Sequence, residues 1–427
     1  MRHVSNTYGG TAMKTVSEKN CIGFGKAVVV LLYAVMLLTT ASAAYAAGDG
    51  SLVRSGTYGP FLDASGQIET RIHYKVFLGH NISGIVAVSS DEVLIGGGAR
   101  IWGGDALLVG SYPYLTSNAA DNRIDSNGNP QNFARRWVGQ SRSQTDSSPP
   151  QHYLFVQAIG MKLRKNIDPW HVEGDPIPYM TRNEMLDYMV YTKYMSATSG
   201  YTRTADAVPP FGYSLISGGG RVVDPFDRQN YLTRSHVLYD ERSGRYYWSV
   251  TARENGTNSK SKVEAFSIAV IENNGYDGFG GGAIPDFGNF NIKICQKPAD
   301  CINTDWDYER LYYPNGMDGL VKYEQAIYKY SHWDLSSYAD FTSRMALPYL
   351  YQQEGKPVLW TTSGIGGSTL YSGNGRFLTG FAFNSDGNGG FITDKQGSSP
   401  NDGYLGGQVI YIVKDSGDAF WDPLNNR

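Results

Sequence analysis

One pattern occurs three times in this 427-residue chain and restricts how it can fold. An aromatic residue that opens a predicted strand is followed, at steps of eighteen and twenty-one residues, by two apolar residues. The three sets are Trp137, Phe155 and Ala158; Trp248, Phe266 and Ala269; and Phe391, Val409 and Ile412. Equal steps indicate one supersecondary unit used three times, so we predict an array of similar modules.

The composition favours β structure for these modules. The chain has 31 Tyr, 17 Phe and 8 Trp, together with 51 Gly and only 18% charged residues. Aromatic side chains suit a pleated, half-buried surface, and glycine suits tight turns and close backbone approach. We therefore predict an all-β chain of tandem antiparallel β-sandwich-like modules with short connecting helices.

Breaks in the pattern predict the organisation of the chain. We expect a flexible lead-in (47–67), a first module (68–165), a linker helix with the second module (178–272), a Gly/Cys insertion (273–319), a linker helix with the third module (320–415) and a tail (416–427). Thr181 and Glu184 form a capping box for the first linker helix, and Ser337–Asp340 predicts its counterpart. The runs Gly96–Gly98 and Gly218–Gly220 predict turns or bulges.

The N-terminus has the pattern of an export signal. Lys14, Lys19 and Lys26 precede the apolar run 27–38, and Ala44-Tyr45-Ala46 fits a cleavage site. The run is too short to span a bilayer, which takes about 20 apolar residues. We predict a signal peptide over residues 1–46, no integral membrane span after cleavage, and a protein that is secreted or held at the cell surface, with the periplasm as the alternative. Met13 is a candidate for the true start.

Two cysteines remain after this segment. Cys295 and Cys301 close a short loop that contains proline, and in an oxidising compartment we expect them to form a disulfide. A zinc site is disfavoured because no further Cys or His pair supplies the remaining ligands.

Charge and motifs exclude several classes of function. A formal net charge of −3 gives no basic field for nucleic acid. The chain has neither G-x-S-x-G nor H-E-x-x-H, and no catalytic residues are predicted. Cofactors are not expected. Calcium is a secondary possibility at the Asn/Asp/Gly loops 125–129 and 384–389, for which simple turns are the default interpretation.

Aromatic and arginine side chains near the Gly runs are the candidate ligand-binding residues. Rings beside polar groups suit sugars, which present apolar CH faces ringed by hydroxyls, and arginine can bind carboxylates or hydroxyls. The candidates are Arg100, Trp102, Tyr112, Tyr114, Arg221, Trp306 and Tyr308. The alternative is packing between modules. Trp137, Trp248 and Phe391 are expected at equivalent core positions.

The first two modules resemble a group of uncharacterised bacterial exported proteins with tandem modules. The resemblance is carried by Val93–Arg100 (VLIGGGAR), Ser111-Tyr112-Pro113, Trp137 and Ala158-Ile159-Gly160, with Met180–Leu186 similar to the helix between modules. The third module matches faintly. The segments 141–144 and 252–255 depart from the Lys-Asp-His-like run of that group. The resemblance implies export and names no activity.

These observations predict an exported bacterial binding protein. We expect the loops of its repeated β-modules to recognise glycan or another cell-surface component, as in adhesion. The alternatives are a secreted toxin or hydrolase component, with the segment 273–315 as the active part, and a protein that self-associates into a matrix or filament.

Overall fold

A computed structural model describes the chain in segments between residues 50 and 412. The described residues are 50–62, 68–115, 123–124, 130–131, 134–144, 150–164, 178–196, 202–223, 230–240, 242–243, 245–255, 262–271, 301–303, 308–313, 321–330, 342–346, 361–371, 376–385, 387, 390–396 and 403–412. Most of them lie in antiparallel strands, which confirms the all-β prediction.

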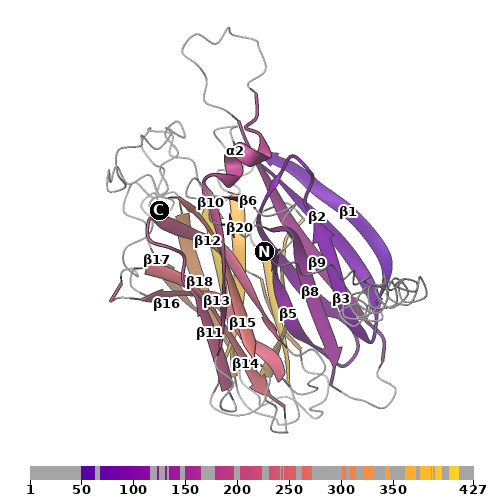
Figure 1. Cartoon of the computed structure of the whole chain (residues 1–427). Coiled ribbons are helices and arrows are strands. Elements are labelled where there is room, and N and C mark those ends of the chain that lie inside the picture. Colours follow the sequence, from indigo (N-terminus) through magenta and orange to yellow (C-terminus); the bar gives the residue numbers. More distant parts are fainter. Residues whose placement is uncertain are drawn as a thin grey trace, which may run out of the picture. The chain divides into compact units, whose positions relative to one another are not determined.

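Three large sheets contain nearly all of the strands (Figure 1). Sheet 1 has the order β1 (Ser51–Leu62), β2 (Ile68–Gly79), β9 (His152–Leu163), β4 (Val93–Trp102), β21 (Arg376–Phe383), β22 (Gly390–Gln396) and β19 (Thr342–Ala346). Sheet 2 has the order β10 (Met189–Met195), β15 (Val263–Ile271), β12 (Tyr213–Val222), β5 (Ala106–Leu115), β8 (Ala134–Ser143) and β3 (Asn81–Ala87). Sheet 3 has the order β11 (Thr202–Ala207), β14 (Arg245–Glu254), β13 (Asn230–Asp240), β20 (Thr361–Tyr371), β23 (Gly403–Ile412), β18 (Val321–Tyr330), β17 (Tyr308–Tyr313) and β16 (Cys301–Asn303). A separate ribbon pairs β6 (Arg123–Ile124) with β7 (Pro130–Gln131).

Each third of the chain contributes three strands to each of two sheets. The first module gives β2, β9 and β4 to sheet 1 and β5, β8 and β3 to sheet 2; the second gives β10, β15 and β12 to sheet 2 and β13, β14 and β11 to sheet 3; the third gives β18, β23 and β20 to sheet 3 and β21, β22 and β19 to sheet 1. The same strand order therefore occurs three times. The modules are not separate beads, because every large sheet is shared by two of them.

The Gly-rich segments are strands that join the modules, so the expectation of turns was wrong, whereas the alternative expectation of bulges is confirmed by register shifts at Leu94/Gly96 and Leu215/Ser217. β4 pairs with β21, β12 with β5, and β20 with β13. A Cβ atom on Gly96 would lie 1.8 Å from the carbonyl oxygen of Ser363, and one on Gly364 would lie 2.8 Å from that of Ile216. Glycine is needed here for close backbone approach between modules. The Ser363 hydroxyl also donates a hydrogen bond of 2.7 Å to the Ile216 carbonyl.

Irregularities in strand pairing recur at matching positions and fix the correspondence between modules. The three Gly-rich strands carry register shifts at Leu94/Gly96, Leu215/Ser217 and Thr362/Gly364. The strands that follow carry shifts at Leu108/Gly110, Leu232/Arg234 and Leu378/Gly380. One extra residue bends a strand and increases its twist.

Counting from these bulges confirms that Trp137 and Trp248 are equivalent and shows that Phe391 is not. Each indole donates to a serine across the strand pair: Trp137 to Ser111 at 2.9 Å and Trp248 to Ser235 at 3.0 Å. Gly390 takes this position in the third module, and Phe391 is the next residue. The equal spacing in the sequence does not mark equivalent residues. Counted from the bulges, Phe155 stands opposite Arg100, whereas the residue opposite the equivalent Arg221 is Glu264, two residues before Phe266.

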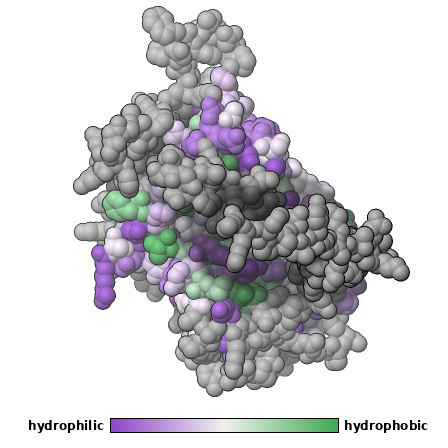
Figure 2. Space-filling view, viewed as in Figure 1, coloured by the Kyte–Doolittle hydropathy of each residue, from purple (hydrophilic) through white to green (hydrophobic). Residues whose placement is uncertain are grey.

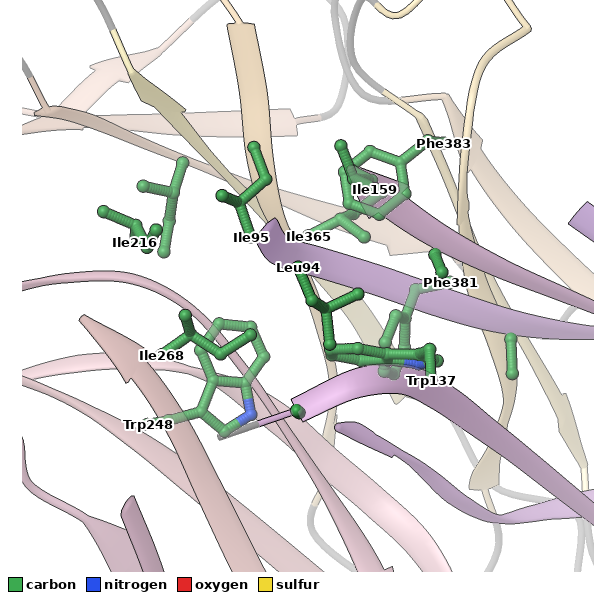
Figure 3. Packing of buried hydrophobic residues seen from close by; sticks show 14 of the residues in the cluster. Leu94, Ile95, Trp137, Ile159, Ile216, Trp248, Ile268, Ile365, Phe381 and Phe383 are labelled. Carbon is green, nitrogen blue, oxygen red and sulfur yellow. The ribbon is translucent and has the colours of Figure 1, made fainter. Parts of the chain in front are cut away.

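The third module fills the same space with other side chains. A Cβ atom on Gly97 or Gly218 would lie 2.3 Å from the indole of Trp137 or Trp248. The corresponding residue in β20 is Ile365, and a Cβ atom on Gly390 would lie 2.4 Å from its Cδ1. The first two modules thus pair a glycine with a tryptophan, and the third pairs an isoleucine with a glycine at the same two positions. Figure 3 shows Trp137, Trp248 and Ile365 projecting into a common core, and all three belong to one buried cluster.

The segments between modules confirm one prediction and correct another. Helix α2 (Arg182–Leu186) begins with the predicted capping box, in which Thr181 and Glu184 bond each other's backbone N–H groups. The expected flexible lead-in contains β1, which pairs with β2 along its length, so that prediction was wrong for Ser51–Leu62. Residues 1–46, with the predicted signal, and 337–340, with the second predicted helix, lie outside the described residues. Among the helices that are described, none has the length and apolar character needed to cross a membrane.

Candidate functional site: an aromatic platform on sheet 1

The structure divides the predicted ligand-binding residues between two sheets. Arg100 and Trp102 lie together in β4 of sheet 1, while Tyr112 and Arg221 lie together in β5 and β12 of sheet 2. Tyr114 in β5 is 42% exposed. Trp306 and Cys295 lie outside the described residues; Tyr308 and Cys301 lie in β17 and β16, where only the backbone is described.

Tyr112 and Arg221 form an internal cluster that joins the first two modules. Arg221 donates to Glu264 at 2.6 Å and to the hydroxyl of Tyr112 at 3.1 Å, and its guanidinium lies 4.9 Å from the centre of the Tyr112 ring. The ring stacks on Phe266, and burial raises the pKa of Tyr112 despite the nearby Arg221. Although burial opposes the charge, Tyr112 and Glu264 together raise the pKa of Arg221. This pair joins two modules, as the packing alternative predicted. Its ring and its guanidinium are already engaged by neighbouring side chains of the protein.

Sheet 1 carries a row of aromatic rings on the face that points away from sheet 2. Phe77 of β2 packs toward sheet 2, because a Cβ atom on Gly84 of β3 would lie 2.4 Å from its ring. Side chains alternate along a strand, so Tyr74 lies on the opposite face. The rings of Tyr58, Tyr74, Phe155 and Trp102 follow one another across β1, β2, β9 and β4, with centroid separations of 4.6, 5.5 and 5.3 Å.

Two exposed rings lie at the end of this row. Tyr74 and Phe155 are buried, whereas Trp102 is 38% exposed and Tyr153 is 43% exposed. Trp102 and Tyr153 stand opposite each other in the β4–β9 register. Trp102 packs on Phe155, with 5.3 Å between the ring centroids. We call Tyr58, Tyr74, Trp102, Tyr153 and Phe155 the aromatic platform.

Two arginines flank the aromatic platform. The guanidinium of Arg54 lies 5.9 Å from the centre of the Tyr74 ring. That of Arg100 lies 5.1 Å from the Trp102 ring and 5.6 Å from the ring of Phe391, which belongs to the third module. Both distances for Arg100 fall within the range of cation–π attraction. Phe391 therefore contributes to the surroundings of the platform and not to the core position expected for it.

The sequence predicted Arg100 and Trp102 but missed the other members of the platform. Tyr153 and Phe155 alternate in β9, and Tyr74 and Val76 alternate in β2 with polar residues between them. That alternation is a signal for one shared face. The row itself depends on the pairing of β1 with β2, in a segment that was not predicted as a strand.

The opposite face of sheet 1 carries a chain of polar contacts near its edge. His73 contacts the hydroxyl of Thr57 at 3.1 Å through Nδ1 and the carboxylate of Glu92 at 2.6 Å through Nε2. Burial opposes ionisation of Glu92, but His73, the backbone N–H of Ser89 and Arg71 together lower the pKa of its carboxyl group. Gly160 gives this carboxylate room, because a Cβ atom there would lie 2.2 Å from its Oε2. The imidazole of His73 thus links a hydroxyl and a carboxylate.

The third junction between modules, on sheet 3, contains a buried histidine. His236 lies beside Arg234, opposite Ser249 in β14. Burial first, and then the charge of Arg234, lower the pKa of His236 to about 3. Arg234 bonds Thr251 through Nε at 3.0 Å, and burial lowers its own pKa as well. The imidazole is therefore neutral in the folded protein at ordinary pH.

This histidine predicts a loss of stability in mild acid. The unfolded chain takes up a proton near pH 6.5 while the folded chain does not, so the free energy of unfolding falls as the pH drops from about 6.5 toward 3. We expect about 2 kcal/mol less stability at pH 5 than at pH 7 from this group alone. Urea unfolding of the wild type and of His236→Leu at both pH values measures it, and the variant should lose markedly less. Equal losses in the two proteins would contradict the assignment.

In the orientation of Figure 1, the described surface mixes hydrophilic and hydrophobic residues, and the hydrophobic ones form small separate patches (Figure 2). Within the described part of the chain, no three His, Cys, Asp or Glu side chains gather in a way that could hold a metal ion. No protein-family model matches the chain, and no curated protein matches it either.

Proposed function

We propose that this protein binds glycan through the aromatic platform of sheet 1. The observation that carries the proposal is the exposed pair Trp102 and Tyr153, of which Trp102 packs on the buried ring of Phe155 and lies beside Arg100. Sugar rings have apolar CH faces that pack on aromatic rings, and their hydroxyls accept hydrogen bonds from arginine. An export signal would place such a protein outside the cell or in the envelope, where glycans are abundant.

The three junctions differ in how they support this proposal. On sheet 2 the equivalent arginine is engaged by Glu264 and Tyr112, and on sheet 3 the junction holds the buried His236 and the partly buried Arg234, whose Nε bonds Thr251. Among the described residues, sheet 1 has two exposed aromatic rings, Trp102 and Tyr153, beside its arginine, whereas sheet 2 has Tyr114 near an arginine that is already paired with Glu264. We therefore propose one principal binding surface per chain, in place of three sites acting together.

Replacing Trp102 tests the proposal. We expect Trp102→Ala to weaken binding at least tenfold for any glycan that the wild type binds on a glycan array, because stacking on an aromatic ring contributes about 1–3 kcal/mol by analogy with other planar ligands. The matched control is Tyr194→Ala, which removes a ring that is 59% exposed on sheet 2. Isothermal titration with both variants measures the effect. Binding that survives Trp102→Ala, or is lost equally in the control, would rule out the platform.

A further inference from the structure

We infer that Thr57, His73 and Glu92 form a second site, at which the Thr57 hydroxyl attacks carboxylic esters and the protein acts as an acyl hydrolase. Thr57 and His73 stand opposite each other in the β1–β2 register, on the face of sheet 1 that points away from the aromatic platform. The inference is therefore independent of glycan binding. It follows from hydrogen bonds, from the burial of the three side chains and from a comparison of the first two modules.

The hydrogen bonds fix the direction in which a proton can move. His73 contacts the Thr57 hydroxyl through Nδ1 at 3.1 Å and the Glu92 carboxylate through Nε2 at 2.6 Å. An ionised carboxylate only accepts hydrogen bonds, so Nε2 of the neutral ring carries the hydrogen and Nδ1 keeps its lone pair. The Thr57 hydroxyl therefore donates to Nδ1, and His73 is oriented as the base that takes this proton.

Glu92 is held in the ionised form that this tautomer requires. Its side chain is only 1% exposed, and its carboxylate accepts a hydrogen bond of 3.0 Å from the backbone N–H of Ser89. Burial opposes ionisation, but His73, this N–H group and the charge of Arg71 together lower the pKa of the carboxyl group. Glu92 is therefore a positioning residue, which orients the His73 ring and stabilises the imidazolium that forms when the ring takes a proton.

Exposure decreases along the three residues in the order that catalysis needs. Thr57 is exposed on β1, which is first in the order of sheet 1, and the side chain of His73 is 14% exposed. A substrate can therefore reach the hydroxyl, while the carboxylate of Glu92 stays shielded from water. Lys75 lies on the same face, opposite Ser55 and diagonal to Thr57. A long side chain can span such a diagonal, so Lys75 is placed to stabilise the oxyanion of the ester.

The second module lacks this arrangement, although it has the corresponding strands. Counted from the bulges, the counterparts of His73, Glu92 and Gly160 are Thr192, Tyr213 and Ala269. A Cβ atom on Gly160 would lie 2.2 Å from Oε2 of Glu92, so the carboxylate needs a glycine there. The fold of a module therefore requires neither His73 nor Glu92, and three positions of the first module differ together in a way that accommodates them.

The reaction takes place in two steps that conserve atoms and electrons. In the first, Oγ of Thr57 forms a bond to the ester carbonyl carbon and its proton passes to Nδ1 of His73; the bond to the alcohol oxygen then breaks, and that oxygen takes the proton. In the second, water attacks the acyl group on Thr57 and gives a proton to His73; the bond to Oγ breaks, and Oγ recovers the proton. An ester and water are thus converted to a carboxylic acid and an alcohol.

The experiment uses the full chain with p-nitrophenyl acetate as the probe. Release of p-nitrophenol is followed by absorbance, and peptide mass spectrometry locates the acetyl group. We expect acetylation of Thr57 and a rate that falls about a hundredfold or more in Thr57→Val and in His73→Asn, because general-base catalysis contributes about 10²–10⁴-fold. Thr57→Ser should keep the activity. The matched control is Thr204→Val, an exposed threonine whose hydroxyl contacts Thr251 at 3.0 Å, and it should change nothing.

The role of Glu92 has its own measurement. Glu92→Gln should lower the rate, and nitrogen NMR of the His73 ring should show the hydrogen on Nε2 in the wild type and a shift toward the other tautomer in the variant. A lower rate with an unchanged tautomer would contradict the positioning role.

The remaining outcomes decide the inference. It is overturned if the wild type hydrolyses the ester no faster than Thr57→Val, or if acetyl groups are found on lysines alone. It is also overturned if the rate survives Thr57→Val and is lost in His73→Asn, because His73 would then attack the ester itself. Thr57 is exposed, so its variants decide the question even if Glu92→Gln fails to fold. Trp102→Ala should hydrolyse the ester like the wild type, which separates this site from the aromatic platform.

Discussion

Trp137→Ala is expected to lower the free energy of unfolding by about 3–5 kcal/mol, because it leaves a large cavity in a close-packed core. The indole is completely buried, lies on Gly97 and donates to Ser111, so the substitution also leaves a buried hydroxyl without its donor. Urea or guanidinium unfolding followed by tryptophan fluorescence measures the change. Trp248→Ala should show a loss of similar size, because its surroundings are equivalent.

Two further variants make this prediction sharper. Trp102→Ala removes the same side chain from an exposed position and should change stability by less than about 1 kcal/mol. The double variant Gly97→Ile, Trp137→Gly copies the pair Ile365 and Gly390 of the third module and should recover part of the loss. If Trp137→Ala lowers the free energy of unfolding no more than Trp102→Ala does, the buried tryptophans are not the core residues that stabilise each module.

Breaking the buried ion pair of the third module is the second large effect that we expect. Arg376 donates to both carboxylate oxygens of Asp394, each at 2.5 Å, and both side chains are almost completely shielded from water. Removing one partner leaves a buried charge without compensation, so Arg376→Met should cost about 3–5 kcal/mol, measured by chemical unfolding.

The double variant tests the reason for that cost. Arg376→Met, Asp394→Leu removes both charges and should be more stable than Arg376→Met alone, because apolar side chains can replace a buried pair. The counterparts of Asp394 are Ser141 and Ala252, which shows that the fold accepts uncharged residues at this position. A double variant as unstable as the single one would indicate that the pair is required for its geometry.

The sequence predicted those parts of the fold that local patterns encode. Alternating aromatic residues predicted strands, the pair Thr181 and Glu184 predicted a helix start, and the recurrence of Trp137 and Trp248 predicted repetition. The sharing of sheets could not be predicted, because β4 pairs with β21 through residues such as Ala99 and Phe381, which lie far apart in the chain. The glycine runs were interpreted as turns or bulges because glycine permits turns, bulges and close backbone contact alike, and only the neighbouring module decides among them.

The candidate site shows the same limit. Arg100 and Trp102 could be singled out because they are near each other in the sequence and chemically suited to a ligand. Tyr112 and Arg221 are likewise an aromatic residue beside an arginine. Glu264 and Phe266 nevertheless enclose them, and both belong to β15, which lies more than 40 residues after Arg221 in the chain. Whether an arginine beside an aromatic ring serves packing or recognition depends on what stands opposite it across the sheet.

Because β4, in the first third, takes its neighbour β21 from the last third, the ring of modules closes only after almost the whole chain has been synthesised. Contacts of such sequence separation slow folding, and until they form, the edge of β4 can pair with strands of other molecules. A chain truncated before residue 376 would keep two complete repeats and still lack its closure. We expect it to aggregate instead of folding as a smaller version of the protein.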